Sequence, residues 1–291
     1  MQATTGHWAS PLGFDIFHRC WDPGSPARGQ VLLVHGLSEH SGRYGHVAQA
    51  LVDRGWRVHA FDHLGHGQSS GARQRIQRFE DLSDTLAAFR QHVHAQAPQL
   101  PLVMIGHSMG GLLAANDAAD HPDACAAVVL SAPAVQVSPH ISAWTVRIGR
   151  LLSVLAPDVG VLGLDPVWIS RDPAVVSAYQ ADPLVNHNKT PARLAAELLR
   201  AMQNLAPKLH RISAPLWVIQ GTQDRLVDPD GARFLMSKVS SPERHLQLYD
   251  GLYHECFNEP ERAQVLVEMC DWLDGVLPAS TDTAAPSASI A

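Results

Sequence analysis

The chain of 291 residues has few cysteines, and none of them stands in metal-binding spacing. Cys20, Cys125, Cys256 and Cys270 are scattered without a C-x-x-C motif, which disfavours both a disulfide framework and a zinc site. The sequence also has no His, Asp and Glu set with ligand spacing, so we expect no metal. Reduced thiols suit a cytoplasmic protein, and this is the location that we expect.

The sequence also lacks the signals of nucleic-acid binding, secretion, membrane insertion and cofactor binding. The formal net charge of -6 leaves no basic excess to neutralise phosphates, so nucleic acid is not an expected partner. Residues 1–13 hold neither a basic segment nor an apolar core, and we expect no signal peptide. No apolar run approaches the roughly 18 residues of a membrane-spanning helix. Gly65-His66-Gly67 lacks the spacing of a dinucleotide fingerprint and no G-K-[ST] occurs, so no cofactor is expected.

Short apolar runs alternate with helix-length amphipathic stretches in most of the chain. The runs that we expect to be strands are 31–34, 58–61, 102–105, 126–130, 216–219 and 246–249. The predicted helices are 44–54, 79–96, 109–120, 230–239 and 260–276. This alternation is typical of an α/β protein with a parallel sheet covered on both faces. The extended segments before residue 24 predict an antiparallel hairpin.

One region interrupts the alternation. Residues 134–207 contain no clear strand and several prolines, and we interpret them as a helical cap inserted over the strand ends. Within the cap, residues 141–155 place apolar side chains on one helical face, although a helix packed on the sheet would show the same pattern. The predicted core therefore has two parts, 1–133 and 208–277. Residues 278–291, rich in Ala, Ser and Thr, are expected to be a disordered tail.

The most informative motif is the pentapeptide Gly106-His107-Ser108-Met109-Gly110. This G-x-S-x-G pattern directly follows the predicted strand 102–105 and opens the predicted helix 109–120. A serine on such a strand-to-helix turn is a nucleophile elbow. Only small neighbours leave room for the strained serine backbone, which accounts for the two glycines. The pattern alone is weak, and the flanking strand and helix make it specific.

A serine nucleophile needs a base, usually a histidine oriented by a carboxylate. In α/β-hydrolases the chain order is serine, acid, histidine. Asp224 follows the predicted strand 216–219, and His254 follows the predicted strand 246–249. We therefore predict a catalytic triad of Ser108, Asp224 and His254. Asp228 is the competing acid, and we favour Asp224 because it lies closer to the strand end.

The oxyanion of acyl transfer needs two hydrogen-bond donors. One is expected from the N–H of Met109, the residue after the nucleophile. The N–H of Leu37, in the loop after the predicted strand 31–34, is the best second donor. Two other polar residues look catalytic but have simpler interpretations. We expect Asp62 to organise its loop, and His107 to pack or form hydrogen bonds beside the site.

Several segments together resemble the monoacylglycerol lipases. The stretch His35-Gly36-Leu37-Ser38-Glu39-His40-Ser41-Gly42-Arg43-Tyr44 resembles the H-G-x-x-E-H-S-x-R-Y oxyanion loop of that family. The family pattern continues in order through residues 62–69, the elbow, and residues 176–184, 221–227 and 253–255. The resemblance implies an α/β-hydrolase fold, with a mostly parallel eight-stranded sheet and an inserted helical cap.

The same resemblance implies roles for particular residues. Glu39 and Arg43 would hold the oxyanion loop and the polar end of the substrate pocket, and Tyr179 would contact the glycerol head group. The cap helix 141–155 would line an apolar acyl channel and touch lipid surfaces. Cap residues outside the Tyr179 segment match only loosely, so the preferred acyl chain length is left open.

The function that follows is a cofactor-free serine hydrolase that cleaves monoacylglycerols to fatty acid and glycerol through an acyl-enzyme. A lysophospholipase or a carboxylesterase for short and medium chains is the alternative enzyme. A ligand-binding protein on the same fold is the non-enzymatic alternative. A proline iminopeptidase is disfavoured, because no acidic cluster in the cap stands out as a receptor for a free amino terminus.

Overall fold

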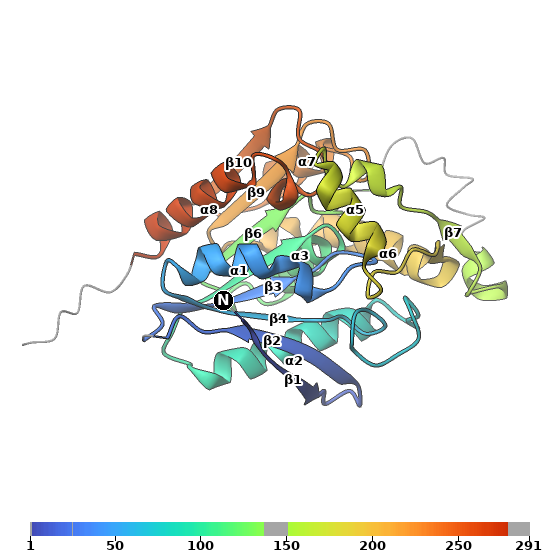
Figure 1. Cartoon of the computed structure of the whole chain (residues 1–291), viewed down its shortest axis with the longest axis horizontal. Helices are drawn as coiled ribbons and strands as arrows, with labels where there is room; N and C mark the ends of the chain where they lie inside the picture. The colour runs from blue at the N-terminus through green and yellow to red at the C-terminus, as the bar shows by residue number, and fades with distance from the viewer. Residues whose placement is uncertain (1, 25, 137–150, 279–291) are drawn as a thin grey trace, which may run out of the picture.

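A computed structural model describes residues 2–24, 26–136 and 151–278. A mixed sheet of eight strands runs through the molecule in the order β1-β2-β4-β3-β5-β6-β9-β10 (Figure 1). The strands are β1 Thr4–Ala9, β2 Asp15–Trp21, β3 Gly29–Val34, β4 Trp56–Phe61, β5 Leu102–His107, β6 Ala127–Ser131, β9 Leu216–Gly221 and β10 Arg244–Tyr249. The hairpin β1–β2 is antiparallel, and β3, β4, β5, β6, β9 and β10 run parallel. The predicted α/β fold class and the mostly parallel eight-stranded sheet are confirmed.

Helices cover both faces of this sheet. They are α1 Gly45–Val52, α2 Glu80–Gln96, α3 Met109–Asp120, α7 Asp230–Lys238 and α8 Arg262–Val276. Strand β3 shows why two layers form, because all six of its residues are buried and successive side chains point to opposite faces. Leu32 and Val34 pack with α2, α3 and α7, whereas Val31 and Leu33 pack with α1 and α8.

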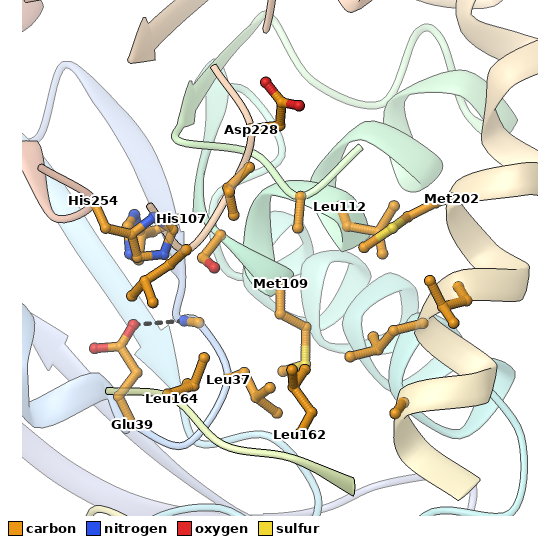
Figure 2. A pocket seen from close by; sticks show the side chains of 18 of the residues that line it. Leu37, Glu39, His107, Met109, Leu112, Leu162, Leu164, Met202, Asp228 and His254 are labelled. Carbon is orange, nitrogen blue, oxygen red and sulfur yellow. Dashed lines mark hydrogen bonds between the residues drawn. The ribbon is translucent and has the colours of Figure 1, made fainter. Parts of the chain in front are cut away.

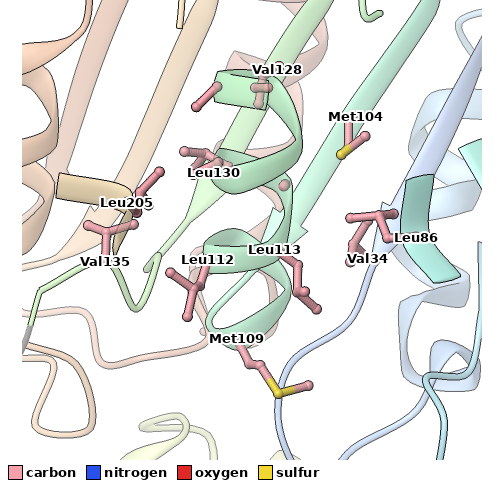
Figure 3. Close-up of a cluster of buried hydrophobic side chains, with 14 of the residues drawn as sticks. Val34, Leu86, Met104, Met109, Leu112, Leu113, Val128, Leu130, Val135 and Leu205 are labelled. Carbon is pink, nitrogen blue, oxygen red and sulfur yellow. The ribbon is translucent and has the colours of Figure 1, made fainter. Parts of the chain in front are cut away.

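Helix α3 lies at the centre of the first of these two layers. Figure 3 shows Met109, Leu112 and Leu113 of α3 among core side chains from neighbouring elements. Eleven of the twelve residues of α3 are buried. Because α3 is packed on nearly all sides, the turn between β5 and α3 has a fixed position.

The segment between β6 and β9 carries further elements. They are β7 Gly160–Leu162, η2 Pro166–Trp168, α5 Pro173–Ala181, β8 Thr190–Pro191, α6 Ala192–Leu205 and η3 Ala206–Arg211. The expectation that residues 134–207 hold no strand is wrong, because β7 and β8 form a small antiparallel pair. Three and two residues are too few for a periodic pattern to show in the sequence.

Two predicted segments lie largely outside the described residues. Of the predicted cap helix 141–155, the structure describes only residues 151–155, which are helical. Of the predicted tail 278–291, it describes only residue 278. In the described part of the chain, no helix is both long enough and apolar enough to cross a membrane.

Candidate active site

Ser108 occupies a one-residue turn between β5 and α3. Its backbone has φ 55° and ψ -116°, a left-handed conformation that costs a non-glycine residue conformational energy. The turn is tight because a Cβ on Gly110 would lie 2.1 Å from the carbonyl oxygen of Val34. A Cβ on Gly106 would likewise lie 2.5 Å from the carbonyl oxygen of Gly110. The strand, turn and helix expected around this serine are all present, with glycine where no side chain fits.

Asp224 and His254 follow β9 and β10, which are adjacent parallel strands. Their carboxyl ends therefore meet at one edge of the sheet, and Nδ1 of His254 lies 2.8 Å from Oδ2 of Asp224. The side chain of Asp224 is fully buried, and its other oxygen accepts the amides of Leu226 at 2.8 Å and Val227 at 3.0 Å. Gln220 adds a hydrogen bond to Oδ2 at 3.0 Å.

Asp228, the competing acid, takes a different place. Its Oδ1 accepts the amide of Asp230 at 3.0 Å, at the start of α7. Asp228 lies among the cavity-lining residues but is not bonded to His254, which pairs with Asp224 instead. The geometry thus favours Asp224 as the acid of the site.

The electrostatics of the pair suit a general base. Burial lowers the pKa of His254, but the carboxylate of Asp224 opposes this and the pKa stands above its usual 6.5. Glu255 and Glu39 act in the same direction on His254. Burial raises the pKa of Asp224, yet His254 and two backbone amides outweigh it and hold that pKa below 3.8. Asp224 is therefore an anion beside a basic imidazole.

His107 lies against this pair without joining it. Its ring centroid is 4.7 Å from that of His254, and its Nδ1 is 3.2 Å from Oγ of Ser131. Burial, followed by the proximity of His254, lowers the pKa of His107 to about 4. His107 is therefore neutral at pH 7 and packs beside the site.

Ser108 and His254 both line a cavity of about 390 Å³, and Figure 2 shows His254 on its wall. Most of its wall is aliphatic or thioether, with many of the residues from the loop after β3, α3, α6 and the segment 152–164. They include Leu37, Met109, Leu112, Leu152, Val161, Leu162, Leu164, Leu198, Leu199 and Met202. Figure 2 shows Met202 across the cavity from His254. Glu39, His107 and Glu255 contribute polar groups to the lining, and Gln136, Tyr179 and Asp228 also line the cavity.

Leu37 and Met109, the expected oxyanion donors, both line this cavity beside Ser108. Met109 is the first residue of α3, where backbone amides have no partner within the helix. The amides of Leu37 and Met109 donate to no acceptor among the described residues. The loop that carries Leu37 is braced by Glu39, whose Oε1 accepts the amide of Gly36 and the hydroxyl of Tyr44, each at 2.6 Å.

Arg43 connects this loop to the loop of His254. Its Nη1 lies 2.6 Å from Oε2 of Glu39 and 2.7 Å from Oε1 of Glu255, and its Nη2 lies 2.7 Å from Oε2 of Glu255. All three side chains are nearly buried. The guanidinium also lies 4.8 Å over the ring of Tyr179, which is buried in α5 and lines the cavity. Arg43 itself is not among the described residues that line the cavity.

Asp62, expected to organise a loop, is fully buried and accepts the amide and hydroxyl of Ser41 and the amide of Gln68. The sequence interpretation assigns no role to Glu255, although this residue stands directly after His254. Its place in the segment 253–255 was the only sign of a role, because its partner Arg43 lies 212 residues earlier in the chain.

The fold and the serine elbow define an α/β-hydrolase. Residues 25–261 match the Hydrolase_4 family model, described as serine aminopeptidase, S33, and the chain belongs to this family. It is 42% identical over 264 residues to a monoacylglycerol lipase of Mycolicibacterium smegmatis, covering 90% of this chain and 93% of the relative. It is 32% identical over 255 residues to the monoglyceride lipase of Homo sapiens, covering 87% and 84%.

Solved structures agree with these relatives. The crystal structure of Paleococcus ferrophilus monoacylglycerol lipase matches with a TM-score of 0.79 and 29% identity, over 95% of this chain and all of that one. A soluble variant of monoglyceride lipase from Saccharomyces cerevisiae, at 24% identity, shares the fold with a TM-score of 0.84 over 95% of each chain. The resemblance seen in the motifs is confirmed.

Proposed function

We propose that this protein is a carboxylic ester hydrolase that cleaves monoacylglycerols to fatty acid and glycerol. One observation carries the proposal: Ser108 and His254 both line a largely apolar cavity of about 390 Å³, and His254 is paired with the buried Asp224. The names of the relatives support the same substrate class. Residues 134–207 serve as the cap over this cavity.

In the proposed reaction, Oγ of Ser108 attacks the ester carbonyl while Nε2 of His254 takes the hydroxyl proton. Asp224 holds Nδ1 of His254 and stabilises the imidazolium that forms. The amides of Leu37 and Met109 stabilise the developing oxyanion. Glycerol leaves with the proton from His254. Water, deprotonated by His254, then attacks the acyl-enzyme, releases the fatty acid and restores Ser108.

The two ends of the cavity suit the two parts of the substrate. The apolar wall from α3 and α6 receives the acyl chain, because burial of each methylene contributes about 0.8 kcal/mol. Tyr179 and Glu39 at the polar end contact the glycerol hydroxyls. Arg43 does not contact the substrate in this proposal. Its guanidinium binds Glu39 and Glu255 and holds them at the polar end.

The family description names an aminopeptidase, but the charges favour an ester substrate. An amine-binding site needs a carboxylate that is free to pair with the substrate ammonium. Of the carboxylates that line the cavity, Glu39 and Glu255 are both paired with Arg43, and Asp228 accepts the amide of Asp230 at the start of α7. The pairing of Glu39 and Glu255 supports a neutral head group such as glycerol at that end of the cavity.

The test is a substrate panel with a nucleophile variant. We expect turnover of 1-monolauroylglycerol, loss of it in Ser108→Ala, and a fluorophosphonate adduct on Ser108. Undiminished turnover in the variant would refute the assignment of the nucleophile. A preference for C4 nitrophenyl esters without monoacylglycerol turnover identifies a short-chain esterase, and preferred lysophosphatidylcholine identifies a lysophospholipase. Absence of both adduct and turnover identifies a ligand-binding protein.

We also propose that the cap contacts lipid surfaces and that the protein is cytoplasmic. Val154 and Leu155 are 70% and 73% exposed, and Leu151 and Val159 are exposed beside them. All four cysteines are free, which supports a reducing compartment. We expect Leu155→Glu to weaken co-sedimentation with phosphatidylcholine vesicles, while turnover of monomeric nitrophenyl butyrate stays unchanged. Equal sedimentation of wild type and variant would argue against the lipid contact.

A further inference from the structure

A buried carboxylate lies behind the loop of His254. Glu259 follows η4 (Cys256–Asn258), and its side chain is 0% exposed. Its Oε1 accepts the amide of Tyr253 at 2.8 Å, and its Oε2 accepts Nε of Arg171 at 2.9 Å. The amide of Arg171 lies 3.3 Å from both oxygens. One carboxylate thus joins the cap to the residue directly before the histidine.

The residue after the histidine is held by the same part of the cap. The amide of Glu255 donates to the carbonyl of Ile169 at 2.8 Å. The neighbouring Ser170 donates its hydroxyl to the carbonyl of Asn258 at 3.0 Å. Both amides that flank His254 therefore bond to one assembly, the cap segment 169–171 together with Glu259.

The acid loop touches the cap just before this segment. Trp168, the last residue of η2, lies 5.4 Å from the ring of Tyr253. Trp168 also contacts Arg225, whose guanidinium lies 3.9 Å over the centroid of the indole ring. Tyr253 precedes His254, and Arg225 follows Asp224. The cap thus holds the neighbours of both members of the acid–base pair.

We propose that Glu259 is a positioning residue that sets the place of His254, and that Arg171 makes this positioning depend on the cap. The inference rests on the proposed function. Glu259 is not among the described residues that line the cavity, so it acts through the backbone of the His254 loop. Displacement of a catalytic group by about 1 Å can cost on the order of 10²-fold in rate.

The test is Glu259→Gln. Both carboxylate oxygens accept hydrogen bonds, and an amide can replace only one of them, so the variant must release Tyr253 or Arg171. We expect kcat for 1-monolauroylglycerol to fall by about tenfold, with KM nearly unchanged, since only the placement of the base is altered. The rate of fluorophosphonate labelling should fall by a similar factor. Glu259→Asp, which keeps both acceptors, should recover part of kcat.

The matched control is Glu261→Gln. Glu261 binds the same Arg171 through Nη2, but it is exposed and makes no bond to the His254 loop. We expect wild-type kcat from this variant. Kinetics are measured at a temperature where circular dichroism shows every variant folded. If Glu259→Gln does not fold, Arg171→Gln takes its place, with a fall in kcat that Glu261→Gln does not share.

Wild-type kcat in folded Glu259→Gln, or in Arg171→Gln where that variant is used, overturns the inference. Such a result leaves the proposed function intact as long as Ser108→Ala abolishes turnover. A KM rise with constant kcat also overturns it, since it would place Glu259 in substrate binding. Loss of activity in wild type on every ester would instead refute the proposed function itself.

Discussion

Arg43 and Glu255 form a two-point ion pair, with Nη1–Oε1 and Nη2–Oε2 both at 2.7 Å. Arg43 belongs to the loop after β3 that carries Leu37, and Glu255 directly follows His254. The planar fork of arginine matches the two carboxylate oxygens and fixes their relative orientation. One buried pair therefore joins the loop of the proposed oxyanion amide to the loop of the proposed base.

Arg43→Gln should destabilise the fold strongly. The change leaves Glu39 and Glu255 buried without their cation, and breaking a buried pair in this way costs about 3–5 kcal/mol. Arg43→Lys keeps the charge but loses the fork, so we expect an intermediate loss. Urea unfolding followed by circular dichroism measures both. Arg75→Gln is the control: its pair with Asp158 is exposed, and we expect a loss below about 1 kcal/mol. Equal losses at Arg43 and Arg75 would contradict the prediction.

The choice between the two acids is tested by Asp224→Asn and Asp228→Asn. Replacing the carboxylate that orients the base lowers kcat by about 10⁴-fold in serine proteases, because the histidine adopts the wrong tautomer. We expect a loss of that order for Asp224→Asn, which keeps the size of the buried side chain. Among the described contacts, the side chain of Asp228 accepts only the amide of Asp230, so its variant should keep nearly full kcat. A reversed order of losses would make Asp228 the acid.

Much of the site was predictable because its positions depend on local patterns. Ser108 stands between an apolar run and a helix, and Asp224 and His254 each follow an apolar run. Parallel strands place their carboxyl ends at one edge, so chain order alone predicts that the three residues gather there. The sheet was predictable for the same reason, since buried strands of a parallel sheet are continuous apolar runs.

The ion pairs around the site had no such pattern. Arg43 and Glu255 are 212 residues apart, and Arg171 and Glu259 are 88 apart. A charged residue on the surface and one in a buried ion pair look alike in the sequence, because only the tertiary fold determines which carboxylate is desolvated. The strand pair β7–β8 was not predicted for a different reason, because strands of three and two residues are too short to show a periodic pattern.

Acid should destabilise the protein through its buried histidines. Burial, followed by the proximity of Arg57, lowers the pKa of His59 in β4 to about 4, against 6.5 in an unfolded chain. Between these two pH values the unfolded state binds more protons than the folded state. The contribution of His59 to the free energy of unfolding is therefore fully present above pH 6.5 and is lost as the pH falls toward 4.

The variant His59→Gln isolates this effect. We expect the unfolding free energy of wild type to fall more between pH 7 and pH 5 than that of the variant, by about 1–2 kcal/mol. Urea titrations at the two pH values give the difference. His210→Gln is the control, because this histidine is exposed on the surface. Identical pH dependence in wild type and His59→Gln would show that His59 does not contribute.

The far end of the cavity should set the acyl chain length. Met202 of α6 lies across the cavity from His254 (Figure 2), so a larger side chain there shortens the channel without touching the acid–base pair. We expect Met202→Trp to lower kcat/KM for 1-monolauroylglycerol by about 15-fold if two methylenes lose their burial, at about 0.8 kcal/mol each. Turnover of nitrophenyl butyrate should stay near wild type, because a C4 chain does not reach Met202. Met236→Trp on α7, outside the lining residues, is the matched control. A parallel loss on both esters would place Met202 near the reacting carbonyl and would require another wall for the acyl chain.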